Sequence, residues 1–244
     1  AIGCDPYYVP EELVYATGMV HMGLWGKPGR PSKAKEYFAA FYCSLVQMNM
    51  EMALSGDLDK LSGVIRTPLC DTLRPASQNF RVGIKNIPMI FMAHPQNRKP
   101  EYGIEYTMKL YTKVLNELEA IAGRKATEED LREAIKVYNE NRKAKREFVR
   151  LAGEHPERVS AVARSAVLKS AYFMEKPQHT AMLKELNGLR AEAPVALWKG
   201  TKGVTSGILC DNPALLRIFD ENQIAIAADD VAQESRSFRK DASE

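Results

Sequence analysis

The chain has 244 residues, and 45% of them are hydrophobic, enough to bury a full core in one large or two smaller domains. Its 34 basic and 31 acidic residues leave a formal charge of +3, too small a surplus to favour nucleic acid as a partner. No window approaches the roughly 18 consecutive apolar residues of a membrane span. The N-terminal AIGCDPYYVP also lacks the basic and apolar segments of a secretion signal, so we expect a soluble, cytoplasmic protein with no membrane partner.

Residues 1–98 alternate between short helices and short strands. Pro10 suits the first turn of a helix and Gly18 its end, while Gly26, Pro28 and later breakers mark a loop. The pattern predicts helices over 9–18, 32–56 and 71–84, and strands over 20–25, 64–66 and 88–92. The second of these helices is expected to carry Cys43 on a mostly buried stretch, with the Met-rich run MNMEM (48–52) in the core. The βαβ order favours a parallel sheet.

The middle of the chain is almost entirely helical, from 100 to 192. Gly123 is expected to end one helix, and Thr127 with Asp130 resembles a capping box that begins the next. After Pro194 the pattern returns to strands over 203–209 and 224–228, the second ending at Asp229-Asp230, with a helix over 212–221 between them. We therefore divide the chain into a first α/β domain (1–98), a helical region (99–192) and the start of a second α/β domain (193–244).

The last of these three parts has two expected strands. Two strands are too few to close a sheet with a hydrophobic face. We expect either that the chain is truncated at its C-terminus or that these strands join a sheet already formed.

The four cysteines are Cys4, Cys43, Cys70 and Cys210, and none forms a C-x-x-C pair. Neither a disulfide scaffold nor a structural zinc site is therefore favoured. Any joint chemistry of these thiols depends on the fold bringing them together.

Reactive or polar groups follow three of the expected strands. They are residues 67–71 with Cys70, the tripeptide 93–95 with His94, and the pair Cys210-Asp211. Ligands gather at the carboxyl ends of parallel strands, and a thiolate just before a helix is stabilised, so Cys70 is a candidate site residue. The alternatives are a buried, unreactive cysteine, a hydrogen-bonded structural histidine, and Asp229-Asp230 as a helix cap.

Four stretches resemble a known family. They are YYVPEELVYATGMVHMGLWG (7–26), FYCSLVQMNMEMALSGDLDKLSGVIRTPLCDTLRPASQNFR (41–81), AHP (93–95) and IAIAADDVAQESRSF (224–238). Together they resemble the D component of 2-hydroxyacyl-CoA dehydratases, especially the smaller, β-type subunits of (R)-2-hydroxyglutaryl-CoA dehydratases. The wider family includes lactoyl-CoA dehydratases and benzoyl-CoA reductases. The resemblance covers nearly all of the chain.

The resemblance implies two flavodoxin-like α/β domains per subunit and a [4Fe-4S] cluster held between them by three cysteines. Two of these match Cys43 and Cys70, and soft thiolates are what such a cluster requires. The third is expected beyond residue 244, because Cys210 lies too early to match it. The resemblance leaves open whether a flavin such as FMN is also bound, and it assigns no other catalytic residue.

The resemblance also implies the activity, that of a hydro-lyase. Such an enzyme eliminates water from an (R)-2-hydroxyacyl-CoA to give the (E)-2-enoyl-CoA, through ketyl radicals, because the β-proton of the substrate is not acidic. The electron comes from an ATP-dependent iron–sulfur activator protein, and the chain pairs with an α-type dehydratase subunit.

Within that heterodimer, two loops favour an electron-relaying role for this chain. They read Asp5-Pro6-Tyr7-Tyr8 and Leu24-Trp25-Gly26, bulky and mostly apolar where a substrate-binding subunit has small or acidic side chains. The alternatives are a benzoyl-CoA-type reductase subunit and a non-catalytic partner or scaffold form of the subunit.

Overall fold

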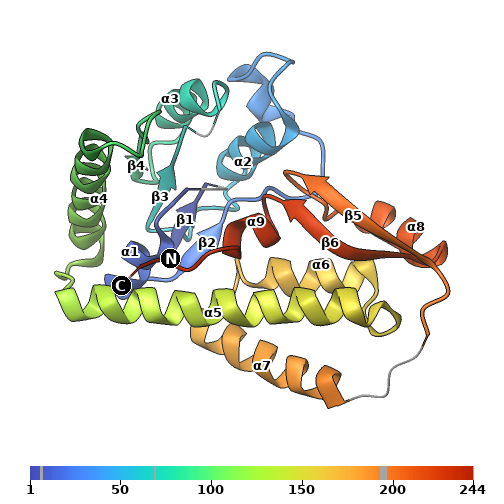
Figure 1. Ribbon diagram of the computed structural model, residues 1–244. Coiled ribbons are helices and arrows are strands. Elements are labelled where there is room, and N and C mark those ends of the chain that lie inside the picture. Colours follow the sequence, from blue (N-terminus) through green and yellow to red (C-terminus); the bar gives the residue numbers. More distant parts are fainter. Residues whose placement is uncertain (6–7, 69, 193–196, 244) are drawn as a thin grey trace. The chain divides into compact units, whose positions relative to one another are not determined.

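The computed structural model describes residues 1–5, 8–68, 70–192 and 197–243 (Figure 1). Contacts between residues divide the chain into two compact units, Ala1–Leu131 and Arg132–Glu244. Among the helices in these described ranges, none is both long enough and apolar enough to cross a membrane.

The first unit is built on a parallel sheet of four strands. The strands lie in the order β2-β1-β3-β4, with all three pairings parallel. This is the flavodoxin-like order, so the parallel sheet expected from the βαβ pattern is confirmed. The elements in chain order are β1 (Ile2–Cys4), α1 (Glu11–Ala16), β2 (His21–Gly23), the 3-10 turn η1 (Lys33–Glu36), α2 (Ser44–Leu54), β3 (Gly63–Arg66), α3 (Leu73–Gly83), β4 (Met89–Phe91) and α4 (Glu101–Ala122).

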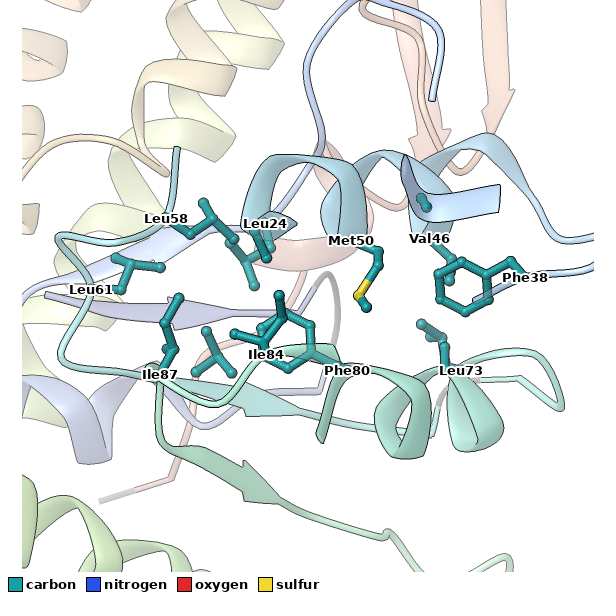
Figure 2. Close-up of a cluster of buried hydrophobic side chains, with 14 residues drawn as sticks. Leu24, Phe38, Val46, Met50, Leu58, Leu61, Leu73, Phe80, Ile84 and Ile87 are labelled. Carbon is teal, nitrogen blue, oxygen red and sulfur yellow. The ribbon is translucent and has the colours of Figure 1, made fainter. Parts of the chain in front are cut away.

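Both faces of this sheet are covered by helices. Side chains of a strand alternate between the two faces, so neighbouring residues pack against different helices. Val64 of β3 packs in one buried cluster with side chains of α2 and α3, including Met50 and Phe80 (Figure 2). The next residue, Ile65, packs in a second cluster with side chains of α1 and α4, including Val114. The Met-rich run in α2 is therefore core, as its pattern predicts.

The central strand β1 is missing from the sequence prediction. It is only three residues long, too short to show a period of two, and its middle residue is Gly3. A Cβ at Gly3 would lie 2.8 Å from Leu61 Cδ1, so a larger side chain there would have to displace its neighbours. The strand therefore carries glycine at a position where β-propensity favours a branched residue.

The prediction of a helix over 32–56 is wrong for the first half of that range. The chain forms η1 there, and α2 begins only at Ser44. The Glu51 carboxylate accepts hydrogen bonds from the Ser32 and Ala34 backbone N–H groups, at 2.9 Å each, and from Ser32 Oγ at 3.0 Å. These contacts hold the earlier segment against α2 instead of in line with it. As a result Cys43 is exposed at the N-cap of α2, not on a buried helical stretch.

The second unit continues from α5 (Glu128–Glu154), which crosses the boundary between the units. The helices expected up to 192 and the following α/β segment are both present, and β5 and β6 pair in parallel. Strand β6 extends through Asp229 and Asp230, beyond its expected end at 228. The elements are η2 (Pro156–Arg158), α6 (Ala161–Ser170), α7 (Lys176–Glu192), β5 (Thr201–Gly207), α8 (Pro213–Glu221), β6 (Ile224–Val231) and α9 (Ser235–Phe238).

Local capping signals are confirmed. Gly123 ends α4 with φ 69°, in the left-handed region where glycine carries no steric penalty. The Thr127 backbone N–H donates to Asp130 Oδ2 at 2.8 Å, and the Asp130 N–H donates to Thr127 Oγ1 at 3.1 Å, which is a reciprocal capping box. These two bonds fix the start of α5.

Candidate functional site

The candidate site lies in the first unit, at the carboxyl ends of β1 and β3. The chain leaves β1 toward β2 on one side and leaves β3 toward β4 on the other. The loops after these two strands therefore diverge, and ligands of doubly wound sheets bind in the crevice opened by such a switch point. The loop after β3 carries Cys70.

Two thiols lie at helix starts in this unit. Cys70 is exposed in the turn between β3 and α3, and its carbonyl accepts a hydrogen bond from Leu73 N at 3.1 Å. Cys43 is exposed at the start of α2, where its carbonyl accepts from Gln47 N at 3.2 Å. Neither thiol forms a disulfide. Leu69, just before Cys70, lies outside the described residues.

The two helices that follow these thiols pack against each other. Val46 lies one turn beyond Cys43, and Leu73 lies three residues beyond Cys70, and both side chains belong to the same buried cluster. Figure 2 shows them at the same end of that cluster. The fold thus brings two exposed thiols, distant in sequence, to the starts of two neighbouring helices. Across the part of the chain that the structure describes, no group of three His, Cys, Asp or Glu side chains is placed to hold a metal ion.

A buried ion pair joins the ends of β1 and β3. Arg66 Nε donates to Asp5 Oδ2 at 3.1 Å, and the side chains are 2% and 0% exposed. Burial raises the pKa of the Asp5 carboxyl above its ordinary value, while the Arg66 charge and a hydrogen bond from the Thr67 backbone N–H act against that rise. The sequence analysis did not select Arg66 as a candidate site residue. An arginine that ends an apolar strand, as in GVIR, is nevertheless a sequence signal for a functional or ion-pairing position.

His94 is hydrogen-bonded to the backbone of the loop that follows β1. Its Nε2 lies 2.8 Å from the Tyr8 carbonyl oxygen, so this nitrogen carries the proton and donates it. Tyr8 has φ 58°, unusual for a bulky residue, and the Arg98 guanidinium lies 4.9 Å from its ring centre. Burial, with Arg98 as a weaker cause, lowers the pKa of His94, which favours the neutral ring. This hydrogen bond is what the alternative of a structural histidine predicts.

The two loops that favoured an electron relay are only partly described. Pro6 and Tyr7 lie outside the described residues. Leu24 and Trp25 are 1% and 5% exposed, so their bulky side chains pack in the interior. Neither side chain presents a polar group at the protein surface.

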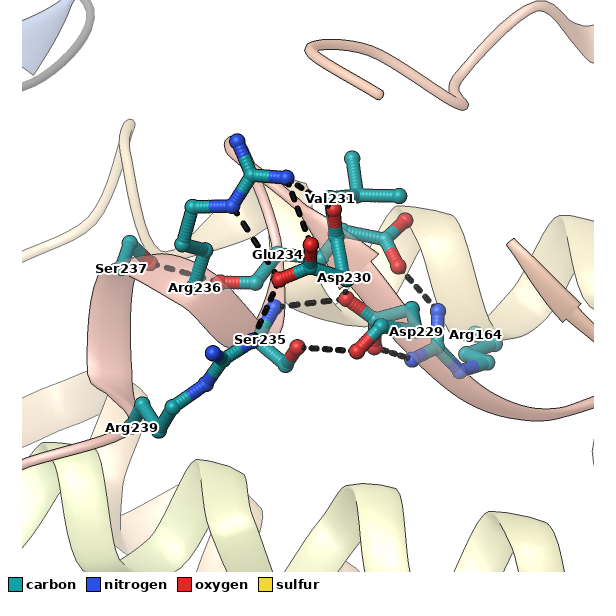
Figure 3. Close-up of polar contacts among 9 residues, drawn as sticks. All are labelled: Arg164, Asp229, Asp230, Val231, Glu234, Ser235, Arg236, Ser237 and Arg239. Atoms are coloured by element: carbon teal, nitrogen blue, oxygen red, sulfur yellow. Dashed lines mark hydrogen bonds and ion pairs between the residues drawn. The ribbon is translucent and has the colours of Figure 1, made fainter. Parts of the chain in front are cut away.

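The other two cysteines are Cys4 and Cys210. Cys4 is buried in β1. Cys210 follows β5 in the second unit, where burial, and then the Glu234 charge, raise the pKa of its thiol. The second unit has its own ionic network, in which Arg164 contacts both Asp229 and Glu234 (Figure 3).

This network has a structural function. Asp229 Oδ1 accepts from Ser235 N at 2.9 Å, which ties β6 to the first residue of α9. Asp230 pairs with Arg236 and Arg239 on the same segment, and these contacts lower the pKa of Asp230 to about 2. Asp229 thus accepts from the first residue of α9, although the N-cap residue of that helix is Glu234.

Comparison with known proteins places these features in a family. The family model described as 2-hydroxyglutaryl-CoA dehydratase, D-component, matches residues 6–244. The chain is 52% identical over 246 residues to the beta subunit of (R)-2-hydroxyglutaryl-CoA dehydratase from Acidaminococcus fermentans, covering 100% of this chain and 65% of that one. It is 44% identical over 240 residues to the (R)-phenyllactyl-CoA dehydratase beta subunit of Clostridium sporogenes, covering 98% and 64%. A benzoyl-CoA reductase subunit of Thauera aromatica is 27% identical over 216 residues, covering 86% and 55%. The chain thus spans slightly under two thirds of the length of the dehydratase subunits it matches.

Proposed function

This chain belongs to the 2-hydroxyglutaryl-CoA dehydratase D-component family, and from that membership we propose that it is the iron–sulfur subunit of a 2-hydroxyacyl-CoA dehydratase. The observation that carries the proposal is the pair of exposed thiols, Cys43 and Cys70, at the starts of the neighbouring helices α2 and α3. The proposed reaction is elimination of water from an (R)-2-hydroxyacyl-CoA, such as (R)-2-hydroxyglutaryl-CoA, to the (E)-2-enoyl-CoA.

The residues present fit two of the ligands of a [4Fe-4S] cluster. Thiolates are the ligands such clusters take, and both thiols are accessible rather than buried in the core. Each also lies near a helix N-terminus, whose positive dipole end favours an anionic group. On this proposal Cys43 and Cys70 hold the cluster together with a third thiolate from outside residues 1–244. When bound, the cluster supplies one-electron transfer at this edge of the sheet.

We propose further that this chain relays electrons and that an α-type partner subunit binds the acyl-CoA. The buried side chains of Leu24 and Trp25 support this division, because they offer the substrate no polar group. The electron donor is then an ATP-dependent iron–sulfur activator protein. The role of this chain's own residues is to hold the two thiols in place at the starts of α2 and α3.

The direct test is iron content. The chain is purified without oxygen together with its co-expressed partner, and iron, acid-labile sulfide and flavin are measured per chain. We expect about four iron atoms for each wild-type subunit that contains this chain together with the third thiolate ligand. Cys70→Ser and Cys43→Ser should lose most of them, while Cys210→Ser, the matched control in the second unit, should retain them. A folded, iron-free wild type, or full iron in both serine variants, contradicts the proposal.

A benzoyl-CoA-type reductase is the second candidate, on the strength of the Thauera aromatica similarity. Its lower identity, 27% against 52% and 44%, favours the dehydratase. An anaerobic assay with the activator, offering 2-hydroxyacyl-CoA and aromatic acyl-CoA substrates in parallel, separates the two. Turnover of the aromatic thioester alone would reverse the assignment.

A further inference from the structure

The buried pair Asp5–Arg66 is incompletely satisfied. Only Arg66 Nε reaches the carboxylate, so the pair lacks the two parallel hydrogen bonds that arginine can form with a carboxylate. Asp5 Oδ1 and Arg66 Nη2 are buried and have no hydrogen-bond partner among the residues that the structure describes. Replacing such a pair with apolar side chains often leaves a protein as stable or more stable. Stability alone therefore gives no reason for charges at this position.

The contacts of the pair lie at the start of the turn that carries Cys70 and beyond its end. The Asp5 carboxylate accepts the backbone N–H of Thr67, which begins that turn. The Arg66 guanidinium lies 4.9 Å from the ring centre of Phe80, on the helix that the turn enters. The first residue of the turn is thus tied to strand β1, and the arginine just before the turn packs on helix α3 about two turns beyond the helix start.

From this geometry we propose that Asp5 and Arg66 are positioning residues for Cys70. They act on the turn through its first residue, Thr67, and the described residues show no hydrogen bond from either side chain to the start of α2. The turn preceding Cys43 is held by other groups, among them the Tyr42 carbonyl, which accepts from Gln47 Nε2 at 2.6 Å. The functional value of this ordering rests on the proposed role of Cys43 and Cys70 as cluster ligands. The ordering itself does not need a bound cluster.

The test measures the mobility of Cys70 directly, by electron paramagnetic resonance of a nitroxide on its thiol. The labelled chain also carries Cys43→Ser and Cys210→Ser, while Cys4 is buried in the folded chain and is expected to be protected from the label. In Arg66→Met, the mobile fraction of the label should rise about fivefold, the factor expected when one net hydrogen bond is lost. Arg66→Lys, which keeps the charge beside Asp5, should restore part of the order.

Two controls make the result specific. A label on Cys43, in a Cys70→Ser and Cys210→Ser background, should be unaffected by the same substitutions. Because Arg66→Met leaves the Asp5 charge buried and alone, the double variant Asp5→Asn with Arg66→Met is measured beside it, so that no unpaired charge remains. Protection of Cys4 from the label reports that each variant is folded.

The outcomes are separable from those of the function proposed above. A Cys70 label that becomes mobile while the Cys43 label does not supports the positioning role, whether or not the wild type binds iron. An unchanged Cys70 label in the folded double variant overturns it. Equal loosening of both labels, labelling of Cys4 in every variant, or no recovery in Arg66→Lys also overturns it, because the pair would then serve general stability.

Discussion

His179, on α7 of the second unit, should make the stability of this protein depend on pH. Its side chain is 2% exposed. Its Nδ1 accepts from Asn141 Nδ2 at 2.9 Å and its Nε2 donates to the Val167 carbonyl at 3.2 Å, so the neutral ring is fully paired. Burial, together with the charges of Lys145 and Lys176, lowers the pKa of His179 to about 4, although the Val167 hydrogen bond acts in the opposite direction.

The magnitude follows from the two protonation states. In the unfolded chain the histidine titrates at its ordinary value of 6.5. Above that pH the ring is neutral in both states, so its titration does not change the free energy of unfolding. As the pH falls from about 6.5 to about 4, the unfolded chain takes up a proton that the folded chain does not, so the free energy of unfolding decreases. The full loss is about 3 kcal/mol, and about 2 kcal/mol of it falls between pH 7 and about pH 5.

The measurement is urea denaturation, followed by far-ultraviolet circular dichroism, at those two pH values. We expect His179→Leu to lose about 2 kcal/mol less than the wild type between them, because its side chain does not titrate. Thr180→Val is the matched control, since it removes a 3.0 Å hydrogen bond from Asn141 and leaves the histidine in place. Equal pH dependence in the wild type and His179→Leu would refute the reasoning.

Three further predictions concern a core side chain, a helical glycine and a buried ion pair, and each is tested by measuring the free energy of unfolding in urea. Phe80→Ala, which empties a 1% exposed site in the α2–α3 cluster, should cost about 4 kcal/mol, and a cost below about 1 kcal/mol would contradict that packing. Gly103→Ala should cost about 1 to 3 kcal/mol because the new Cβ would lie 2.3 Å from the Asn97 carbonyl oxygen, whereas Gly188→Ala meets no atom within 4 Å and should add up to about 1 kcal/mol. Arg164→Met should cost about 3 to 5 kcal/mol by leaving two buried carboxylates unpaired, and adding Glu234→Gln should recover part of that loss; no recovery would contradict the ion pair.

Local chemistry made much of the fold predictable from the sequence. Gly123, the Thr127–Asp130 box and the Asn212 side chain, which accepts from Ala214 N, mark helix ends through atoms only a few residues apart. The alternation of apolar strands and helices likewise predicted a parallel sheet, because a parallel connection needs a crossover helix. The same logic, applied to strand ends, selected the turn with Cys70.

What the sequence could not show depends on partners far apart in the chain. Glu51 holds residues 32–34 from 17 to 19 positions away, and this contact, not local propensity, decides that the first part of the predicted helix packs against α2 instead of extending it. The strand β1 is too short to display a pattern and becomes recognisable only between its neighbours.

The candidate site divides in the same way. The amino-acid sequence is sufficient to identify the side chains that can do thiol chemistry, because residue type sets the donor atoms. The folded chain was needed to show that Cys43 is exposed, that its helix lies beside that of Cys70, and that Asp5 meets Arg66 across 61 positions. Such contacts form when strands pair and helices pack, and no local window of sequence contains both partners.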